Sequence, residues 1–256
     1  MTASDRFVVT VCTDCASAPR HVWENMPPDF MLALAGRKTV RKLGRGDYLF
    51  HQGDACGAVF RLLSGVLLLR KGDRDGHSVV IRMMRPGSTL GYRALVRGEP
   101  HTVSAHCVTD VVVCHIPAQA ARWAFEQNRA LEREFAADMV RNIDCVEDQA
   151  LQMLTLCVRD RVLVLLHQMA GHFGRRDGDG MYIKTPVSKS DMAAMLGIAR
   201  ESMSRSIRRI ENEGLLEFHP DGVSVPSVDR FDESVAAILG PVGTAAQTSC
   251  SFRTPS

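Results

Sequence analysis

Two cysteines separated by two residues, Cys12-Thr13-Asp14-Cys15, lie near the start of the chain. Thiolates at this spacing can bind one metal ion or one iron–sulfur cluster from a single turn of backbone. The same two residues are also compatible with a disordered terminus that happens to carry two thiols. The motif alone does not decide between a metal ligand pair and two unrelated thiols.

These two cysteines belong to a chain of 256 residues with eight cysteines and a formal net charge of +2. The 45% hydrophobic and 23% charged residues exclude a disordered polar chain, a collagen-like chain and a small disulfide scaffold. So small a net charge does not by itself indicate binding to nucleic acid or to a membrane. The longest aliphatic run, 162–166, is far shorter than the roughly 20 residues of a membrane span, and the first residues lack the pattern of a signal peptide. We therefore expect a cytoplasmic protein with no membrane partner, in which cysteines are free, metal-bound or redox-active.

Residues 44 to 117 have the pattern of short strands separated by turns. Turn-forming pairs such as Gly53-Asp54, Gly72-Asp73 and Pro86-Gly87 recur along this stretch, and branched apolar residues fill the segments between them. This pattern predicts a compact β-roll or barrel.

A stretch free of proline and glycine, 118–170, predicts at least two helices. Part of it has apolar residues at alternating steps of four and three, the a/d pattern of a helix that pairs with its own copy. A helix packed against its own domain is the alternative, since three heptads are the minimum for a coiled coil. Nearby acids, Asp144, Glu147 and Asp148, would repel their copies and make a dimer marginal. The predicted seam consists of Met139, Ile143, Val146, Ala150, Met153 and Cys157.

A second, smaller domain is expected from residue 159, with a helix to about residue 173, turns at 174–180 and a short strand from Tyr182 to Thr185. Ser188 and Asp191 have the spacing of a capping box at the start of a helix, and Gly197 supplies a turn before the next helix, about 199–213. Apolar residues at Met192, Leu196, Ile198 and Met203 have the spacing of a helix-turn-helix. An exposed helix of Glu and Arg is the alternative for the second helix, but the helix-turn-helix spacing favours major-groove contacts. The predicted DNA contacts are Ser188, Arg200, Glu201, Ser204, Arg205, Arg208 and Arg209, and residues 214–225 predict a β-hairpin wing.

A β-roll, a long helix and a winged helix-turn-helix in this order resemble the CRP/FNR family of bacterial transcription regulators, from about residue 12 to residue 240. The resemblance implies an α+β fold, in which a β-roll like the cyclic-nucleotide-binding jelly roll precedes a dimerisation helix and a DNA-binding domain. It implies a regulator and not an enzyme. The expected segments are a metal-binding segment at 1–21, the β-roll at 22–125, the dimerisation helix at 126–158, the winged helix-turn-helix at 159–240 and a disordered tail at 241–256.

The segment Glu201-Ser202-Met203-Ser204-Arg205 resembles the Glu-x-x-Ser-Arg signature of the FNR branch, named for the fumarate and nitrate reduction regulator. By this resemblance Glu201, Ser204 and Arg205 read a TTGAT/ATCAA-like inverted repeat in double-stranded DNA, and the protein acts as a homodimer. RNA polymerase is the further partner that the family implies. A basic run from Arg37 to Arg45 could touch DNA or polymerase, although solvated surface is the simpler interpretation.

The FNR branch holds an oxygen-labile [4Fe-4S] cluster with Cys-x-x-Cys-x5-Cys near the N-terminus and one further Cys before an Ile-Pro. Cys12 and Cys15 match the first two positions, and Cys114, in Cys114-His115-Ile116-Pro117, matches the last. The third position holds His21, so the ligand set departs from the family pattern. Three cysteines and a histidine suit a cluster and equally suit structural zinc. Cys107 is a substitute candidate, and His21 can also be a surface residue without a role.

The first alternative is a DNA-binding regulator of the same family in which zinc, haem or a thiol switch takes the place of the iron–sulfur cluster. A thiol or metal enzyme centred on Cys12, Cys15 and His21 is the remote alternative, because it would need a general base and a pocket that the sequence does not indicate.

The cyclic-nucleotide pocket of this family uses a Gly-Glu pair and a later Arg-Ser pair. This chain has Gly91-Tyr92 and His101-Thr102 in those regions. A nucleotide would lack a carboxylate for its ribose and an arginine for its phosphate, so we expect no cyclic nucleotide ligand.

Overall fold

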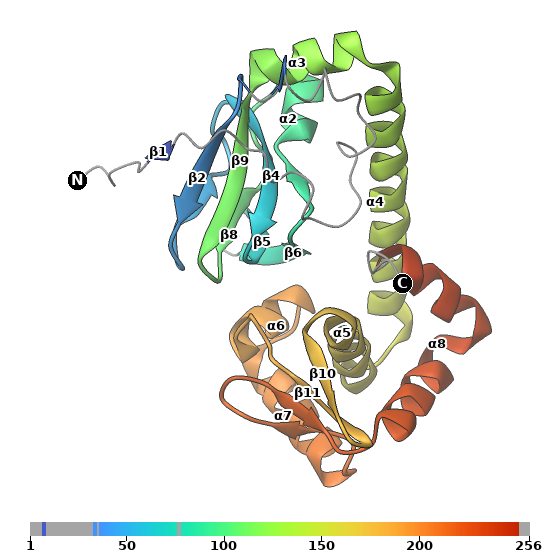
Figure 1. Ribbon diagram of the computed structural model, residues 1–256. Coiled ribbons are helices and arrows are strands. Elements are labelled where there is room, and N and C mark those ends of the chain that lie inside the picture. The colour runs from blue at the N-terminus through green and yellow to red at the C-terminus, as the bar shows by residue number, and fades with distance from the viewer. Residues whose placement is uncertain (1–6, 9–32, 35, 76–77, 251–256) are drawn as a thin grey trace. The chain divides into compact units, whose positions relative to one another are not determined.

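The computed structural model describes residues 7–8, 33–34, 36–75 and 78–250, with side chains described for 33–34, 36–75 and 78–240 (Figure 1). The chain divides into two compact units, one ending at Ala137 and the other beginning at Asp138. Each unit is described by itself below. No helix in the described residues combines the length and the apolar character that a membrane span requires.

The first unit is the predicted β-roll, built from two antiparallel sheets. One sheet has the order β1-β2-β9-β4-β7 and the other β3-β8-β5-β6. Two helices accompany them, α2 at Tyr92–Arg97 and α3 at Ala118–Gln127. The strands are β1 (Phe7–Val8), β2 (Thr39–Leu43), β3 (Tyr48–Phe50), β4 (Ala58–Ser64), β5 (Leu67–Gly72), β6 (Ser78–Met84), β7 (Thr89–Leu90), β8 (Ser104–Cys107) and β9 (Val111–Pro117).

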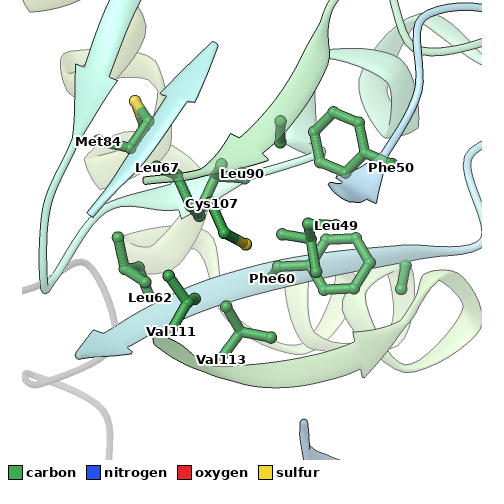
Figure 2. Packing of buried hydrophobic residues seen from close by; sticks show 12 residues of the cluster. Leu49, Phe50, Phe60, Leu62, Leu67, Met84, Leu90, Cys107, Val111 and Val113 are labelled. Carbon is green, nitrogen blue, oxygen red and sulfur yellow. The ribbon is translucent and has the colours of Figure 1, made fainter. Parts of the chain in front are cut away.

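Apolar side chains fill the space between the two sheets (Figure 2). Phe60 and Leu62 from β4 lie in the same buried cluster as Val111 and Val113 from β9 and Cys107 from β8. Side chains alternate between the two faces of a strand. Arg61, next to Phe60 and Leu62, and Cys114, next to Val113, therefore lie on the other face of their sheet. The roll therefore has an apolar interior and a separate outer face.

One glycine shows how tightly the roll turns. Gly65, between β4 and β5, has a φ of +87°, and a Cβ added there would lie 2.2 Å from the carbonyl oxygen of Asp110. A side chain at this position would be strained and would also clash, so this turn requires glycine.

The long helix α4 spans Arg129–Thr155. It begins after Asn128, whose Oδ1 accepts a hydrogen bond from the backbone N–H of Ala130 at 2.9 Å. Near its start, the Phe135 ring contacts Phe125 and Tyr92, with ring centroids 4.8 and 5.6 Å apart. Of the segment 126–158, expected as the dimerisation helix, residues 126–127 belong to α3, residues 129–155 form α4, and residue 158 begins the next helix.

The second unit contains the rest of α4 and a helical domain with a small sheet. Its helices are α5 (Val158–Phe173), α6 (Lys189–Met195), α7 (Arg200–Asn212) and α8 (Val228–Cys250). Only residues 156 and 157 separate α4 from α5. The sheet has the order β10-β11-β13-β12, with β10 at Gly174–Asp177, β11 at Gly180–Ile183, β12 at Glu217–Phe218 and β13 at Val223–Val225.

Three details of this unit differ from the sequence predictions. Within the segment 174–180, expected as turns, residues Gly174–Asp177 form β10, and the strand that pairs with it, β11, begins at Gly180 and not at Tyr182. The seam residue Cys157 lies after the end of α4 in an extended conformation, where its thiol donates to the Asp160 carboxylate at 3.2 Å. In place of a disordered tail from 241, α8 continues after a kink at Gly240 to Cys250; residues 251–256 lie outside the described part of the chain.

Candidate DNA-binding helix, dimer face and metal ligands

The first helix of the helix-turn-helix begins with the predicted capping box. Ser188 Oγ accepts a hydrogen bond from the Asp191 backbone N–H at 3.1 Å, and the Asp191 carboxylate accepts one from the Ser188 backbone N–H at 3.2 Å. These bonds satisfy donors that a helix start would otherwise leave unpaired. The Ser188 hydroxyl, predicted as a DNA contact, is thus also a structural part of α6.

A tight turn joins α6 to α7. Gly197 has a φ of +61°, and the backbone N–H of Ile198 donates to the carbonyl of Ala193 at 3.0 Å. Met192 and Ala193 of α6 are buried, as is Met203 of α7. The turn and this apolar contact fix the second helix across the first, which is the arrangement of a helix-turn-helix.

The helix α7 has one buried face and one polar face. Met203, Ser206, Ile207 and Ile210 are buried. The predicted contacts are on the remaining surface and are exposed: Arg200, Glu201, Ser204, Arg205, Arg208 and Arg209. The structure therefore places six of the seven predicted DNA contacts together on one exposed surface of α7.

Two of these side chains have contacts within α7. The Ser204 hydroxyl donates to the carbonyl of Arg200 at 3.0 Å, and the Arg205 guanidinium donates to Ser202 Oγ at 3.3 Å. Both bonds are on the surface and can exchange for bonds to a base edge or a phosphate at little cost, since a typical hydrogen bond contributes only about 1 kcal/mol net.

Glu213, at the end of α7, was not among the predicted residues and organises this end of the helix. Its carboxylate accepts from Arg159 Nε of α5 at 2.9 Å and from Arg209 Nε at 3.1 Å. These two guanidinium groups hold the pKa of Glu213 below its usual value, and the carboxylates of Glu213 and Asp160 raise the pKa of Arg159. Arg209 is thus ion-paired with Glu213 within the chain, although its side chain remains 69% exposed. The pairing between Arg159 and Glu213 spans 54 residues, so no local pattern indicates it.

The predicted wing is present as the hairpin of β12 and β13. The two strands pair through Phe218 and Val223, and the backbone N–H of His219 donates to the carbonyl of Gly222 at 2.9 Å. The Tyr182 hydroxyl donates to Asp221 at 2.7 Å and so links β11 to the hairpin turn. The carboxylate acceptor raises the pKa of Tyr182 and is itself held below its usual pKa.

The helix α4 has an exposed apolar face. Ile143, Val146 and Met153 are 56%, 52% and 50% exposed, although apolar side chains in the middle of a helix are usually buried. Ala150 is exposed and Met139 is half-buried, so the five seam residues on α4 are all solvent-accessible. The face is wider than the predicted seam, since it also includes Val140, Leu151 and Leu154.

Of the four predicted metal ligands, Cys114 alone lies in the described part of the chain; Cys12, Cys15 and His21 lie outside it. Cys114 is 2% exposed, on the outer face of β9. Its cross-strand partner on β4 is Arg61, which is also 2% exposed. Among the described residues, no group of three His, Cys, Asp or Glu side chains could hold a metal ion.

Comparison with known proteins matches both halves of the chain to one family. Residues 40–128 match the cyclic nucleotide-binding domain, and residues 160–233 match the Crp-like helix-turn-helix domain. The chain belongs to the CRP/FNR family of transcription regulators. This CRP/FNR regulator therefore binds DNA, and its relatives are regulators and not enzymes, as expected from the sequence.

Individual relatives cover most of this CRP/FNR regulator. The transcriptional activator protein Anr of Pseudomonas aeruginosa is 27% identical over 222 residues, which are 86% of this chain and 90% of the relative. The anaerobic regulatory protein of Bacillus subtilis is 24% identical over 195 residues, 76% of this chain and 82% of the relative. The solved structure of FixK2 from Bradyrhizobium japonicum has a TM-score of 0.67 at 18% identity, covering 77% of this chain and 96% of FixK2.

Tyr92 and His101, the two residues that the sequence comparison singled out in the β-roll, are both buried. His101 is 6% exposed and stacks on Phe50 with ring centroids 3.9 Å apart. Burial lowers the pKa of the His101 imidazole, because the charged form is disfavoured away from water. Tyr92 is buried against Phe135 and offers no carboxylate.

Cys107, the substitute ligand candidate, lies inside the roll. It is fully buried in the apolar cluster, paired through β8 with Leu67 of β5 (Figure 2). Burial, with a smaller contribution from Asp47, raises the pKa of this thiol to about 12. In this position Cys107 packs as a small buried apolar residue.

Proposed function

We propose that this CRP/FNR regulator is a cytoplasmic homodimer of the FNR branch that binds a TTGAT/ATCAA-like inverted repeat in response to oxygen or redox state. The observation that carries the proposal is the exposed row of Glu201, Ser204 and Arg205 on the second helix of a capped helix-turn-helix. Arginine pairs with guanine and a carboxylate accepts from cytosine, so these side chains suit G·C pairs in the major groove.

Two copies of this helix are required to read an inverted repeat, and the exposed face of α4 supplies the contact. Ile143, Val146 and Met153 are about half exposed in one chain, and pairing with the same face of a second copy would bury them. A dimer of this kind sets two recognition helices about one turn of DNA apart. RNA polymerase is the partner that we propose for the DNA-bound dimer.

The proposed sensor is a metal centre held by Cys12, Cys15, His21 and Cys114. Cys114 fits such a centre because it lies on the outer face of the sheet opposite Arg61, a buried cation without a hydrogen-bond partner among the described residues. When bound, a [4Fe-4S] cluster supplies an oxygen-labile centre that protein side chains alone do not provide. The name of the anaerobic regulatory protein of Bacillus subtilis is consistent with this assignment. Loss of the centre would then weaken pairing along α4.

We further propose that no cyclic nucleotide acts on this regulator. His101 is buried and stacked on Phe50, and Tyr92 is buried, in the regions where the resemblance places the arginine and the carboxylate of the nucleotide pocket. Cyclic AMP should leave DNA binding unchanged.

Anaerobic purification followed by iron, sulfide and zinc analysis, absorption and Mössbauer spectra tests the sensor. We expect iron and sulfide in the wild-type protein, their loss in Cys114→Ser and their retention in the matched variant Cys107→Ala. DNA binding to the inverted repeat should fall after exposure to air. A colourless protein with stoichiometric zinc under strict anaerobiosis would exclude the cluster and favour a zinc regulator.

A further inference from the structure

Arg61 is the one fully buried arginine of the described residues whose guanidinium lacks every hydrogen-bond partner. It is 2% exposed, and Nε and both terminal nitrogens have no acceptor among the residues that the structure describes. An arginine keeps its charge at all ordinary pH values. A buried, unpaired cation is unfavourable, so a group that carries negative charge is expected next to it.

The sheet register identifies what lies beside Arg61. Its Cα partner on β9 is Cys114, and its Cα partner on β7 is Thr89. Directly opposed residues of antiparallel strands share one face, with Cβ atoms about 5 Å apart. Thr89 Oγ1 is likewise buried without a partner among the described residues. Three adjacent strands therefore place a thiol, a cation and a hydroxyl in one row.

The metal centre of the proposed function has the charge that this row requires. Three thiolates and a neutral histidine around zinc, or around an oxidised [4Fe-4S] core, add three negative charges to two positive ones. The remaining single negative charge is opposite in sign to Arg61. This balance results from the histidine, because a fourth thiolate would leave two negative charges.

Building on that proposed function, we propose that Arg61 is a positioning residue that neutralises the anionic metal–thiolate centre at Cys114, with Thr89 as a second polar group. Arg61 does not ligate the metal. Its charge stabilises the metal-loaded protein electrostatically. In the metal-free protein the same charge is buried without a partner and destabilises the fold. Removal of the charge should therefore have opposite effects on the metal-free and the metal-loaded protein.

The test compares the full chain, purified anaerobically, with Arg61→Met, Arg61→Lys and the control Arg70→Met. Arg70 is a half-buried arginine on β5, in the other sheet. Metal content per chain, the rate of metal release to a chelator and the unfolding midpoint of the metal-free protein are measured. Arg61→Met should release metal about tenfold faster, since outer-shell partners affect metal affinity by about 10- to 100-fold.

The other measurements separate an electrostatic role from a structural one. Metal-free Arg61→Met should unfold at a higher temperature than the metal-free wild type, because the unpaired charge is gone. Arg61→Lys retains the charge and should stay near the wild-type release rate, as should Arg70→Met. If iron is bound, Arg61→Met should also lower the reduction potential of the centre, because reduction adds negative charge.

Three results would overturn the proposal. If the wild type binds metal, Cys114→Ser does not, and Arg61→Met releases metal at the wild-type rate, the role of Arg61 is wrong while the proposed function stands. Faster release together with a lower metal-free midpoint would indicate general destabilisation. A wild-type chain that binds no metal under strict anaerobiosis would overturn both the role of Arg61 and the proposed sensor.

Discussion

Arg159, the second residue of α5, donates from Nε to the carboxylate of Glu213 at 2.9 Å and connects the end of the recognition helix α7 to α5. The pair is partly buried, with side chains 19% and 32% exposed, and Arg209 adds a second donor to the same carboxylate. A network of this kind sets the orientation of the helix more firmly than an isolated surface pair. The first prediction concerns this carboxylate.

Glu213→Gln should lower the free energy of unfolding of the helix-turn-helix unit by about 1 kcal/mol at pH 7, because the charged pair is replaced by a neutral hydrogen bond. The pKa of Glu213 is lowered in the folded protein, so its stabilisation is present above the unfolded pKa of about 4.3 and is lost as the pH falls through the folded value. Denaturant unfolding at pH 7 and below pH 4 should show the difference between wild type and variant narrowing with acid. A difference that does not depend on pH would contradict the role of the charge.

Substitution of the reading residues should change the DNA sequence preference. Arg205→Ala should cost about 1–3 kcal/mol on an inverted repeat and relax the preference at one base pair of each half-site. Arg208→Ala is the control for a backbone contact, since it should weaken all sequences similarly and reduce the dependence on salt. Binding titrations on the repeat and on single-base variants distinguish the two. If Arg205→Ala lowered the binding affinity equally for every DNA sequence, Arg205 would not contact a base.

A charge on the exposed face of α4 should prevent dimerisation. Val146→Glu places two carboxylates in an apolar contact and should shift the protein to monomers. Val96→Glu is a matched control, because Val96 is 62% exposed but lies on α2. Sedimentation measures the result. If Val146→Glu remained a dimer, the dimer contact would have to lie on a surface other than this face of α4.

Neutralising an acid beside this face should have the opposite effect. Asp148 lies between Val146 and Ala150 on α4 and would approach its own copy in a dimer. Asp148→Asn should therefore increase the dimer fraction in air, where the wild type would dissociate. The exposed Glu134, nearer the start of α4, supplies the control Glu134→Gln. An unchanged monomer fraction in sedimentation would count against repulsion at Asp148.

The sequence predicts most of the architecture because local patterns encode it. Turn residues spaced along 44–117 indicate the roll, and the positions of Ser188, Gly197 and Met203 indicate the helix-turn-helix, which the comparisons confirm. The apolar steps along α4 indicate an exposed stripe on a single chain, and the structure shows Ile143 and Val146 about half exposed.

Features that depend on distant pairing are not visible in the sequence. An arginine within a strand is normally a surface residue, and only the register of β4 with β9 and β7 shows that Arg61 lies buried between Cys114 and Thr89. The heptad pattern assigned Cys157 to the seam because periodicity does not reveal where a helix stops. β10 was missed because its residues, Gly174 to Asp177, have low strand propensity and are held by pairing with β11.

The junction between α4 and α5 is only two residues long, so it limits how far the angle between these two helices can vary. Thr155 ends one helix, Val158 begins the next, and Arg159 immediately contacts the end of α7. In the proposed dimer, this short rigid path relates the angle between two copies of α4 to the distance between two recognition helices. The length of the junction, and not any base contact, would then determine which spacing between half-sites the protein accepts.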